Sequence, residues 1–299
     1  MTSSRTGSPV RLSALADPAV HGGRRLVWLA SGEDGSPLGT ASLRLFDRDG
    51  QRHLAEADVR VHPAERRRGV ATLLLGAAVD AAREDGRRSV VAQADSGSPG
   101  AGFLGARGFE TALTLIHARL PLASADVPAL TALVAGAPAG YRLTSWEGVV
   151  PDELAESYVA SRRAMDDMPM GTVDYGRVVW DLDRVRSAAA AVADRGDLLH
   201  TVAAVDETDG SLVGFTELVV PGGGEGDAQH YGTAVLPEHR GHGLGTLLKA
   251  ASILHARERH PRLGGLLTDT AEHNHPMRGV NDLLGYRPTH TALEFQLTL

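Results

Sequence analysis

A glycine-rich segment in the second half of the chain has the composition of an anion-binding turn. Residues 239–246 read HRGHGLGT and stand between an expected strand and an expected helix. The first N–H groups of a helix have no partner inside the helix, and the positive end of the helix dipole lies beside them. Glycines expose these N–H groups and let a phosphate approach closely. The segment therefore predicts a diphosphate site, and a tight strand-to-helix turn without a ligand is the alternative interpretation.

The residue types that are rare or absent exclude several kinds of chemistry. The 299 residues include no cysteine, which excludes disulfides, thiolate nucleophiles and Cys-ligated metals. Lys249 is the only lysine and follows Leu248, so the Gly-Lys-Ser/Thr phosphate loop is absent. His273 and His275 have no third ligand at helical spacing, and no metal site is expected.

Charge and hydropathy limit the possible partners. The net charge is −7 and the acidic excess lies in the second half, opposite to what a nucleic-acid-binding protein needs. No apolar run reaches the ~18–20 residues of a membrane span. Residues 1–9 are rich in Ser and Gly and lack an apolar signal core, so we expect a cytoplasmic protein that binds neither nucleic acid nor membrane.

The chain contains an internal repeat with an offset of about 175 residues. The matching segments are 35–43 with 210–218, 61–63 with 235–237, Gly69 with Gly243, and 108–109 with 285–286. Four matches in the same order predict a duplicated domain. We expect an N-terminal domain at 1–121, a connecting helix and linker at 122–140, and a C-terminal domain at 141–299.

Each copy has a pattern of short strands followed by an amphipathic helix. Expected strands lie at 25–30, 39–46, 53–61, 89–92 and 113–120 in the first copy and at 200–205, 214–220, 230–236, 264–268 and 292–297 in the second. Helices are expected after Gly69 and Gly243, at 126–135, and in an insert of the second copy at 152–165 and 183–194. A short helix is also expected to end just before 108–109 and 285–286, although residues 95–100 look like a loop where this helix of the first copy should begin. The expected fold class is α/β, with a mixed, mostly antiparallel sheet flanked by helices in each of two tandem domains.

Two motifs of the second copy together resemble those of the Gcn5-related N-acetyltransferase (GNAT) superfamily. The first is Val235-x-Pro237-x-x-Arg240-x-x-Gly243-x-Gly245, and the second runs from Asn274 through Asn281 to Tyr286. The first copy carries a weaker version at residues 61–71, so the resemblance covers most of both halves and is to tandem two-domain members.

The resemblance implies acetyl-CoA as co-substrate, without a metal, and a primary amine of a small molecule as acceptor. It places donor binding at Ala234, Val235, Arg240, Gly241, His242, Gly243, Leu244, Gly245, Thr246, Asn274 and Asn281. The expected reaction is direct acetyl transfer in the second domain. A non-catalytic acyl-CoA-binding or scaffold protein is the alternative, and a homodimer is possible.

The acid and base of such a reaction are not at the family's usual positions. Gln229 stands where family members often have a glutamate, so Glu217 on the neighbouring strand is the favoured base and His230 the second candidate. The non-catalytic alternatives are that Glu217 is an exposed carboxylate on a strand and that His230 is a surface histidine on an edge strand. Asn281 occupies the slot of the family's usual tyrosine acid, and Tyr286 or Tyr231 could replace it.

Residues at the end of the first insert helix are candidates for the acceptor pocket. Asp166 and Asp167 could attract an ammonium group, and Met168 offers an adaptable apolar contact. A helix-ending turn with methionines in the core is the alternative. The first copy has Ser42, Gly97 and Leu104 where the second has Glu217, Asn274 and Asn281, which favours a degenerate first domain.

Overall fold

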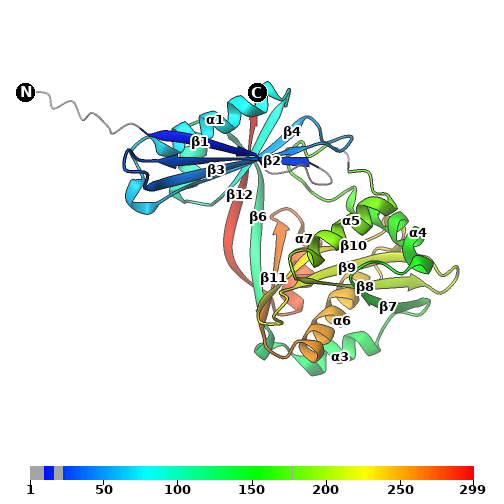
Figure 1. Cartoon of the computed structure of the whole chain (residues 1–299). Helices are drawn as coiled ribbons and strands as arrows, with labels where there is room; N and C mark the ends of the chain where they lie inside the picture. The colour runs from blue at the N-terminus through cyan, green and yellow to red at the C-terminus, as the bar shows by residue number, and fades with distance from the viewer. Residues whose placement is uncertain (1–9, 17–22, 177) are drawn as a thin grey trace, which may run out of the picture. The chain divides into compact units, whose positions relative to one another are not determined.

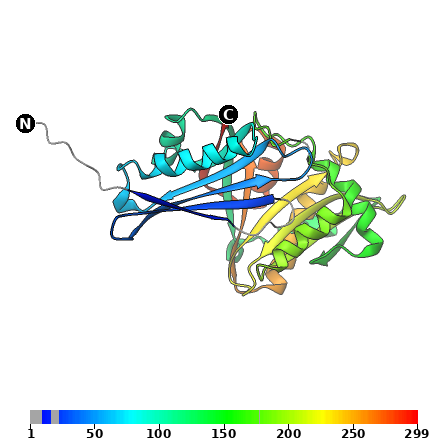
Figure 2. The ribbon, with the colours of Figure 1, turned by 45° about the horizontal axis from the view of Figure 1, so that its top comes forward.

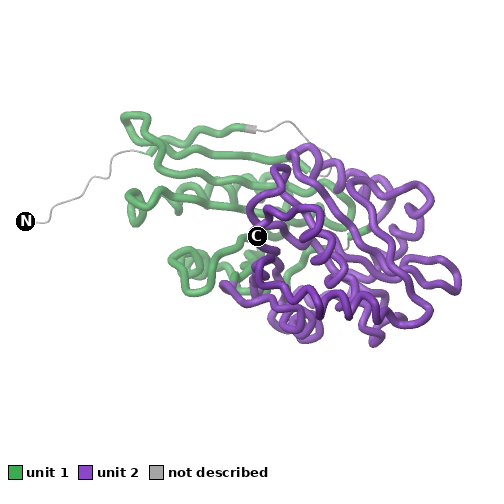
Figure 3. Tube along the Cα trace, turned by 90° about the horizontal axis from the view of Figure 1, so that it is seen from below, with its two compact units in different colours: residues 1–113, 171–179, 292–299 green, residues 114–170, 180–291 purple. Residues whose placement is uncertain are grey.

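The computed structural model describes residues 10–16, 23–176 and 178–299. The prediction for residues 1–9 lies outside this range. The chain forms two compact units (Figure 3). Unit 1 contains residues 1–113, 171–179 and 292–299, and unit 2 contains residues 114–170 and 180–291.

Unit 1 is a sheet with strand order β1-β2-β3-β4-β5-β12. Its elements are β1 (Arg11–Ala16), β2 (Gly23–Ser31), β3 (Pro37–Phe46), β4 (Leu54–Val61), η1 (Pro63–Glu65), α1 (Val70–Glu84), β5 (Ser89–Asp95) and α2 (Pro99–Gly105). Helix α1 lies along one face of the sheet (Figure 2). On β3 the buried residues Ala41, Leu43 and Leu45 alternate with less buried ones, because successive side chains of a strand point to opposite faces.

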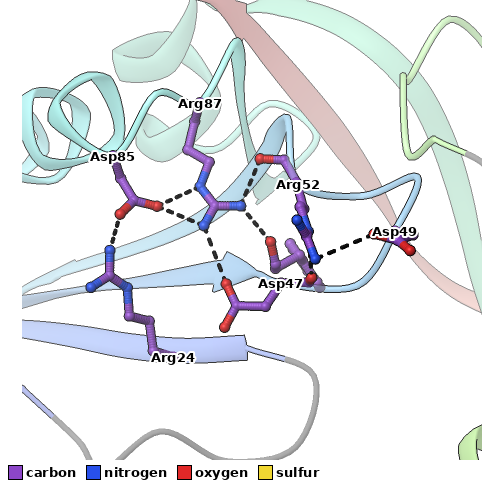
Figure 4. A network of polar contacts seen from close by, with 7 residues as sticks. Arg24, Asp47, Asp49, Arg52, Asp85 and Arg87 are labelled. Carbon is purple, nitrogen blue, oxygen red and sulfur yellow. Dashed lines mark hydrogen bonds and ion pairs between the residues drawn. The ribbon is translucent and has the colours of Figure 1, made fainter.

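A buried arginine joins the end of α1 to the loop between β3 and β4 (Figure 4). The Arg87 side chain is 5% exposed and forms ion pairs with Asp85 and Asp47. It also donates to the main-chain oxygen of Arg52 at 2.7 Å. Arg24 on β2 pairs with Asp85. Because every charge in this set has a partner, the network fixes the turns without leaving a buried ion uncompensated.

The strands of unit 2 form a mixed sheet in the order β6-β11-β10-β9-β8-β7. Its strands are β6 (Glu110–Pro121), β7 (Tyr141–Glu147), β8 (Leu198–Asp206), β9 (Leu212–Val220), β10 (Gly226–Val235) and β11 (Leu263–Ala271). Its helices are η2 (Leu122–Ser124), α3 (Val127–Ala135), α4 (Asp152–Ser161), η3 (Arg162–Met165), α5 (Leu182–Ala193), η4 (Pro237–His239), α6 (Leu244–Arg259) and α7 (His275–Leu283) (Figure 1). All nine residues of β9 are buried, because α6 and α4 both pack against this strand.

In each unit the sheet includes the last strand of the other sequence copy. Residues 115–121 of β6 pair antiparallel with β11 in unit 2, and residues 292–298 of β12 (Arg287–Thr298) pair antiparallel with β5 in unit 1. Residues 171–179 of the insert also belong to unit 1, where Thr172 N–H donates to the Ala112 oxygen at 2.9 Å. The compact units are thus made of several segments and do not coincide with the expected domains 1–121 and 141–299. Those boundaries stay a prediction for the extent of the two sequence copies.

The expected fold class is confirmed: both sheets are mixed, mostly antiparallel and flanked by helices. Two elements were not expected from the sequence, namely the edge strands β1 and β7, whereas the short helix expected before residues 108–109 is present as α2. A loop was expected at residues 95–100, but Ser98 caps a helix that begins at Pro99. Within the described part of the chain, no helix is both long and apolar enough to span a bilayer.

Candidate active site

The glycine-rich segment leads the chain from β10 through η4 into α6. Gly241 and Gly243 have φ values of +84° and +76°, which residues with a Cβ adopt only at a cost. Gly243 is the N-cap of α6 and has no side chain with which to cap the first N–H groups of the helix. A Cβ at Gly241, Gly243 or Gly245 would meet nothing within 4 Å. The turn therefore presents main-chain N–H groups to open space, a geometry that suits an anion.

A cleft of about 590 Å³ lies along this turn, within unit 2. Of the residues expected to bind the donor, those that line it are Ala234, Val235, Arg240, Gly241, Gly243, Leu244, Gly245, Thr246 and Asn274. Asp167 and Met168, expected on the acceptor side, line it as well. Its volume lies in the range of cofactor sites. Among the described residues, no group of three or more His, Cys, Asp or Glu side chains could hold a metal ion.

Strands β10 and β11 separate beside the cleft. They pair in parallel between residues 226–229 and 263–267. β10 then continues to Val235 paired with β9 alone, as far as the described register goes. An unpaired strand edge offers N–H and C=O groups to an extended ligand, as a neighbouring strand would. Ala234 and Val235, two of the residues expected to bind the donor, lie on this stretch and in the cleft wall.

Three residues expected to bind donor or acceptor do not line the cleft, and neither do the two expected bases, Glu217 and His230. His242 places Nδ1 3.2 Å from the main-chain oxygen of His239, and Asp166 is exposed after η3. Asn281 is 5% exposed and bonds other buried side chains. Asn274 does line the cleft, and its Oδ1 also accepts from Met277 N–H at 3.2 Å, which caps α7.

Glu217 is held in a buried ion pair. It is 7% exposed, and its carboxylate accepts hydrogen bonds from the Tyr158 hydroxyl at 2.7 Å and from Arg162 Nη1 at 3.0 Å. Arg162 is 3% exposed and also lies 4.4 Å from the ring centre of Trp180. Both carboxylate oxygens are thus engaged by buried donors, and Glu217 does not line the cleft. These contacts therefore do not favour the role of base expected for Glu217.

His230 lies in a buried chain of hydrogen-bonding side chains that reaches the cleft wall. Its Nε2 is 2.9 Å from the Tyr286 hydroxyl, and its Nδ1 is 3.4 Å from Oγ1 of Thr216. Thr216 Oγ1 is in turn 2.6 Å from Oγ1 of Thr233, which lines the cleft. Burial lowers the pKa of His230 well below its usual value, and the neighbouring Lys249 lowers it further. The imidazole is therefore neutral, with hydroxyl groups leading from it to the cleft.

Lys249 is buried next to these hydrogen-bonded side chains. From the sequence it served only to exclude a Gly-Lys-Ser/Thr phosphate loop, and no role was expected for it. Its Nζ donates to Asn281 Oδ1 at 2.6 Å and lies 4.5 Å from the ring centre of Tyr286. Asn281 Nδ2 donates to Thr270 Oγ1 at 3.0 Å. Burial lowers the pKa of Lys249 to about 7, although the charge of Asp269 raises it. A signal was present in the sequence, since a lone lysine beside the apolar face of a helix is unusual.

Arg240 and Asp167, expected in different subsites, form one ion pair in the cleft wall. Arg240 Nη1 and Nη2 donate to the two carboxylate oxygens of Asp167 at 2.5 and 2.8 Å. This hydrogen bonding lowers the pKa of Asp167 and raises that of Arg240. Sequence reasoning missed the pair because the two residues are 73 positions apart.

Unit 1 repeats the turn but not the chemistry around it. Gly69 has a φ of +84° and caps α1, and Arg66 Nε donates to the Val61 oxygen at 3.4 Å, as Arg240 Nε does to the Val235 oxygen at 2.9 Å. Leu104 is buried in the core in place of Asn281. The matched backbone geometry supports a common origin of the two copies.

Known proteins resemble the chain over most of its length. The sequence profile of the acetyltransferase (GNAT) family matches residues 8–109 and 172–286. The mycothiol acetyltransferase of Nocardia farcinica is 30% identical over 269 residues, which cover 89% of this chain and 81% of that protein. The mycothiol acetyltransferase of Thermomonospora curvata is also 30% identical, over 78% of this chain and 70% of that protein. A tandem GNAT protein from the clavulanic acid biosynthesis pathway, solved without AcCoA, has a TM-score of 0.76 and 28% identity, covering 94% of this chain and 84% of that one. The chain therefore belongs to the acetyltransferase (GNAT) family, as an N-acetyltransferase of tandem layout.

Proposed function

We propose that unit 2 transfers an acetyl group from acetyl-CoA directly to a primary amine of a small molecule. The observation that carries this proposal is the open cleft built on the left-handed glycine turn before α6. The relatives named mycothiol acetyltransferase support acetyl transfer, and mycothiol-synthase-like chemistry is one form that it can take here.

The donor would be held mainly by main-chain groups. In this proposal the diphosphate lies against the N–H groups of residues 244–246, which begin α6, line the cleft and have no partner inside the helix. The free edge of β10 near Ala234 and Val235 would pair with the pantetheine arm. When bound, acetyl-CoA supplies a thioester carbonyl activated toward a nitrogen nucleophile.

A proton acceptor is needed because an alkylammonium with a pKa near 10.4 has no free lone pair at neutral pH. Of the two expected bases, His230 is better supported than Glu217, since Glu217 is bound to Arg162 and Tyr158. His230 is neutral and connects through the hydroxyls of Thr216 and Thr233 to the cleft. In this proposal it accepts the amine proton through these two hydroxyls only transiently, because burial lowers its pKa and favours the neutral ring.

The acceptor would enter on the side of Asp167 and Met168, which line the cleft after η3. The carboxylate of Asp167 suits an ammonium group, and Met168 offers apolar contact to the carbon skeleton beside it. Asp166 is not retained in this role, because it does not line the cleft.

A non-catalytic acyl-CoA-binding protein is the second candidate. Two observations favour it, namely the ion pair that engages Glu217 and the burial of Asn281 where the family's usual acid would stand. The two candidates differ in turnover and share the donor site.

Calorimetric titration with acetyl-CoA, followed by thiol release with a panel of primary amines, tests both. Gly243→Asp places a carboxylate and a strained backbone in the anion site, and we expect at least a tenfold loss of acetyl-CoA affinity. Gly210→Asp is the matched control, since Gly210 also has a positive φ of +77° and open space but lies in the turn between β8 and β9. Unchanged affinity in Gly243→Asp would refute the donor site. Binding without thiol release for any amine would favour the non-catalytic candidate.

A homodimer and a cytoplasmic location remain predictions. Light scattering of the purified chain checks the first and cell fractionation the second.

A further inference from the structure

The cleft contains its own anion at the place where the proposed donor would bring one. The Asp167 carboxylate forms a two-pronged ion pair with Arg240, whose remaining nitrogen, Nε, donates to the Val235 oxygen at 2.9 Å. Both side chains of the pair line the cleft, and both are about half exposed, at 53% and 43%. Arg240 stands three residues before the N-cap of α6, beside the N–H groups of the glycine turn.

Each partner is held in place by contacts outside the pair. The Nε bond to the Val235 oxygen fixes the guanidinium to the end of β10. On the other side, Ala164 is 1% exposed, and Arg163 forms an ion pair with Glu238. The main chain of η3 therefore stays anchored when the Asp167 side chain turns away from Arg240.

A two-pronged contact with a phosphate group requires the two N–H groups of Arg240 that hold the Asp167 carboxylate, because Nε is bonded to the Val235 oxygen and Nη2 also donates to the Ala164 oxygen at 3.4 Å. Guanidinium binds carboxylate and phosphate with the same planar geometry, so the two anions exclude each other. An exposed ion pair contributes little stability, because water screens both charges. A diphosphate that also gains the free N–H groups of α6 is the stronger ligand.

We propose that Asp167 occupies Arg240 in the free protein and is displaced by the donor's diphosphate, which releases its carboxylate to the acceptor side of the cleft. This inference rests on the donor site proposed above. It makes Asp167 a competitor of the donor and, once displaced, the carboxylate that recognises an ammonium group. Donor binding thereby frees the carboxylate on the acceptor side of the cleft.

Calorimetric titration with coenzyme A and with 3′-dephospho-coenzyme A tests the exchange. Asp167→Asn removes the competing charge, and we expect its affinity for both ligands to rise about threefold to tenfold, since both keep the diphosphate. Asp166→Asn is the matched control, because it removes the same charge one residue away from a side chain that does not line the cleft. Its affinity is expected to stay within about twofold of wild type.

An Arg240→Gln background completes the cycle. There, adding Asp167→Asn is expected to change the affinity by less than about twofold, because no guanidinium remains to compete for. Equal or weaker binding by Asp167→Asn in the wild-type background would overturn the exchange, as would the same gain in Asp166→Asn or in the Arg240→Gln background. If the wild-type chain binds neither ligand, the proposed donor site itself is wrong. If the wild-type chain binds both ligands but Asp167→Asn does not bind them more tightly, only the exchange is wrong.

Discussion

Replacing Lys249 by methionine is expected to stabilise the protein near neutral pH. Lys249 is 1% exposed, and burial lowers its pKa from 10.5 to about 7. At a pH below both values the folded state must bury a charged ammonium, and this pKa difference corresponds to about 5 kcal/mol of lost stability. Methionine has a similar length and no charge. It leaves the Asn281 oxygen without its donor, which costs about 1–3 kcal/mol.

The sign of the pH dependence follows from which state holds the proton. Between pH 7 and 10.5 the unfolded chain keeps the lysine proton that the folded chain has lost, so wild-type stability rises with pH in this window. The advantage of Lys249→Met should therefore be about 2–4 kcal/mol at pH 6 and should shrink by about 3 kcal/mol at pH 9.

Urea unfolding followed by circular dichroism at pH 6, 7.5 and 9 measures this difference. Arg259→Met serves as the control on the same helix, because the Arg259 side chain is 61% exposed and its removal should shift stability equally at each pH. The double variant Lys249→Met/Asn281→Leu removes both polar partners and should keep the pH-dependent gain. A difference between Lys249→Met and wild type that does not vary with pH would refute the reasoning.

Three further outcomes are expected. Glu217→Gln should destabilise the protein by about 3–5 kcal/mol in urea unfolding, because Arg162 stays buried without a counter-charge. The control Glu238→Gln, in an exposed pair with Arg163, should cost less than about 1 kcal/mol. Full stability of Glu217→Gln with lost turnover would instead restore Glu217 as the base. Asp167→Asn should raise the KM for the amine about tenfold with a smaller effect on kcat, as measured by thiol release, and an unchanged KM would remove Asp167 from the acceptor site. Gly176→Ala should destabilise unit 1 by about 1–3 kcal/mol more than Gly35→Ala. Both glycines have a positive φ, but only at Gly176 would a Cβ lie 1.7 Å from the Gly50 oxygen. Equal melting temperatures of the two variants would contradict this prediction.

Local patterns in the sequence determined the element order and the turn that carries the donor proposal. The insert helices expected at 152–165 and 183–194 are confirmed as α4 with η3 and as α5, and the connecting helix expected at 126–135 is confirmed as α3. These features depend on residues within a few positions of one another, namely apolar spacing and glycines with positive φ. The same holds for the repeat, which matching short segments were enough to reveal.

The tertiary structure alone decided which strands and side chains meet. The alternation of β6 and β12 defines a strand but not its partner, so the pairing of β6 with β11 and of β12 with β5 required the folded chain. Glu217 meets Arg162 across 55 residues, and Asp167 meets Arg240 across 73. Charge pairing over such separations depends on how the backbone folds back on itself. The sequence shows that a carboxylate is present, but not whether it faces solvent, a substrate or a buried guanidinium.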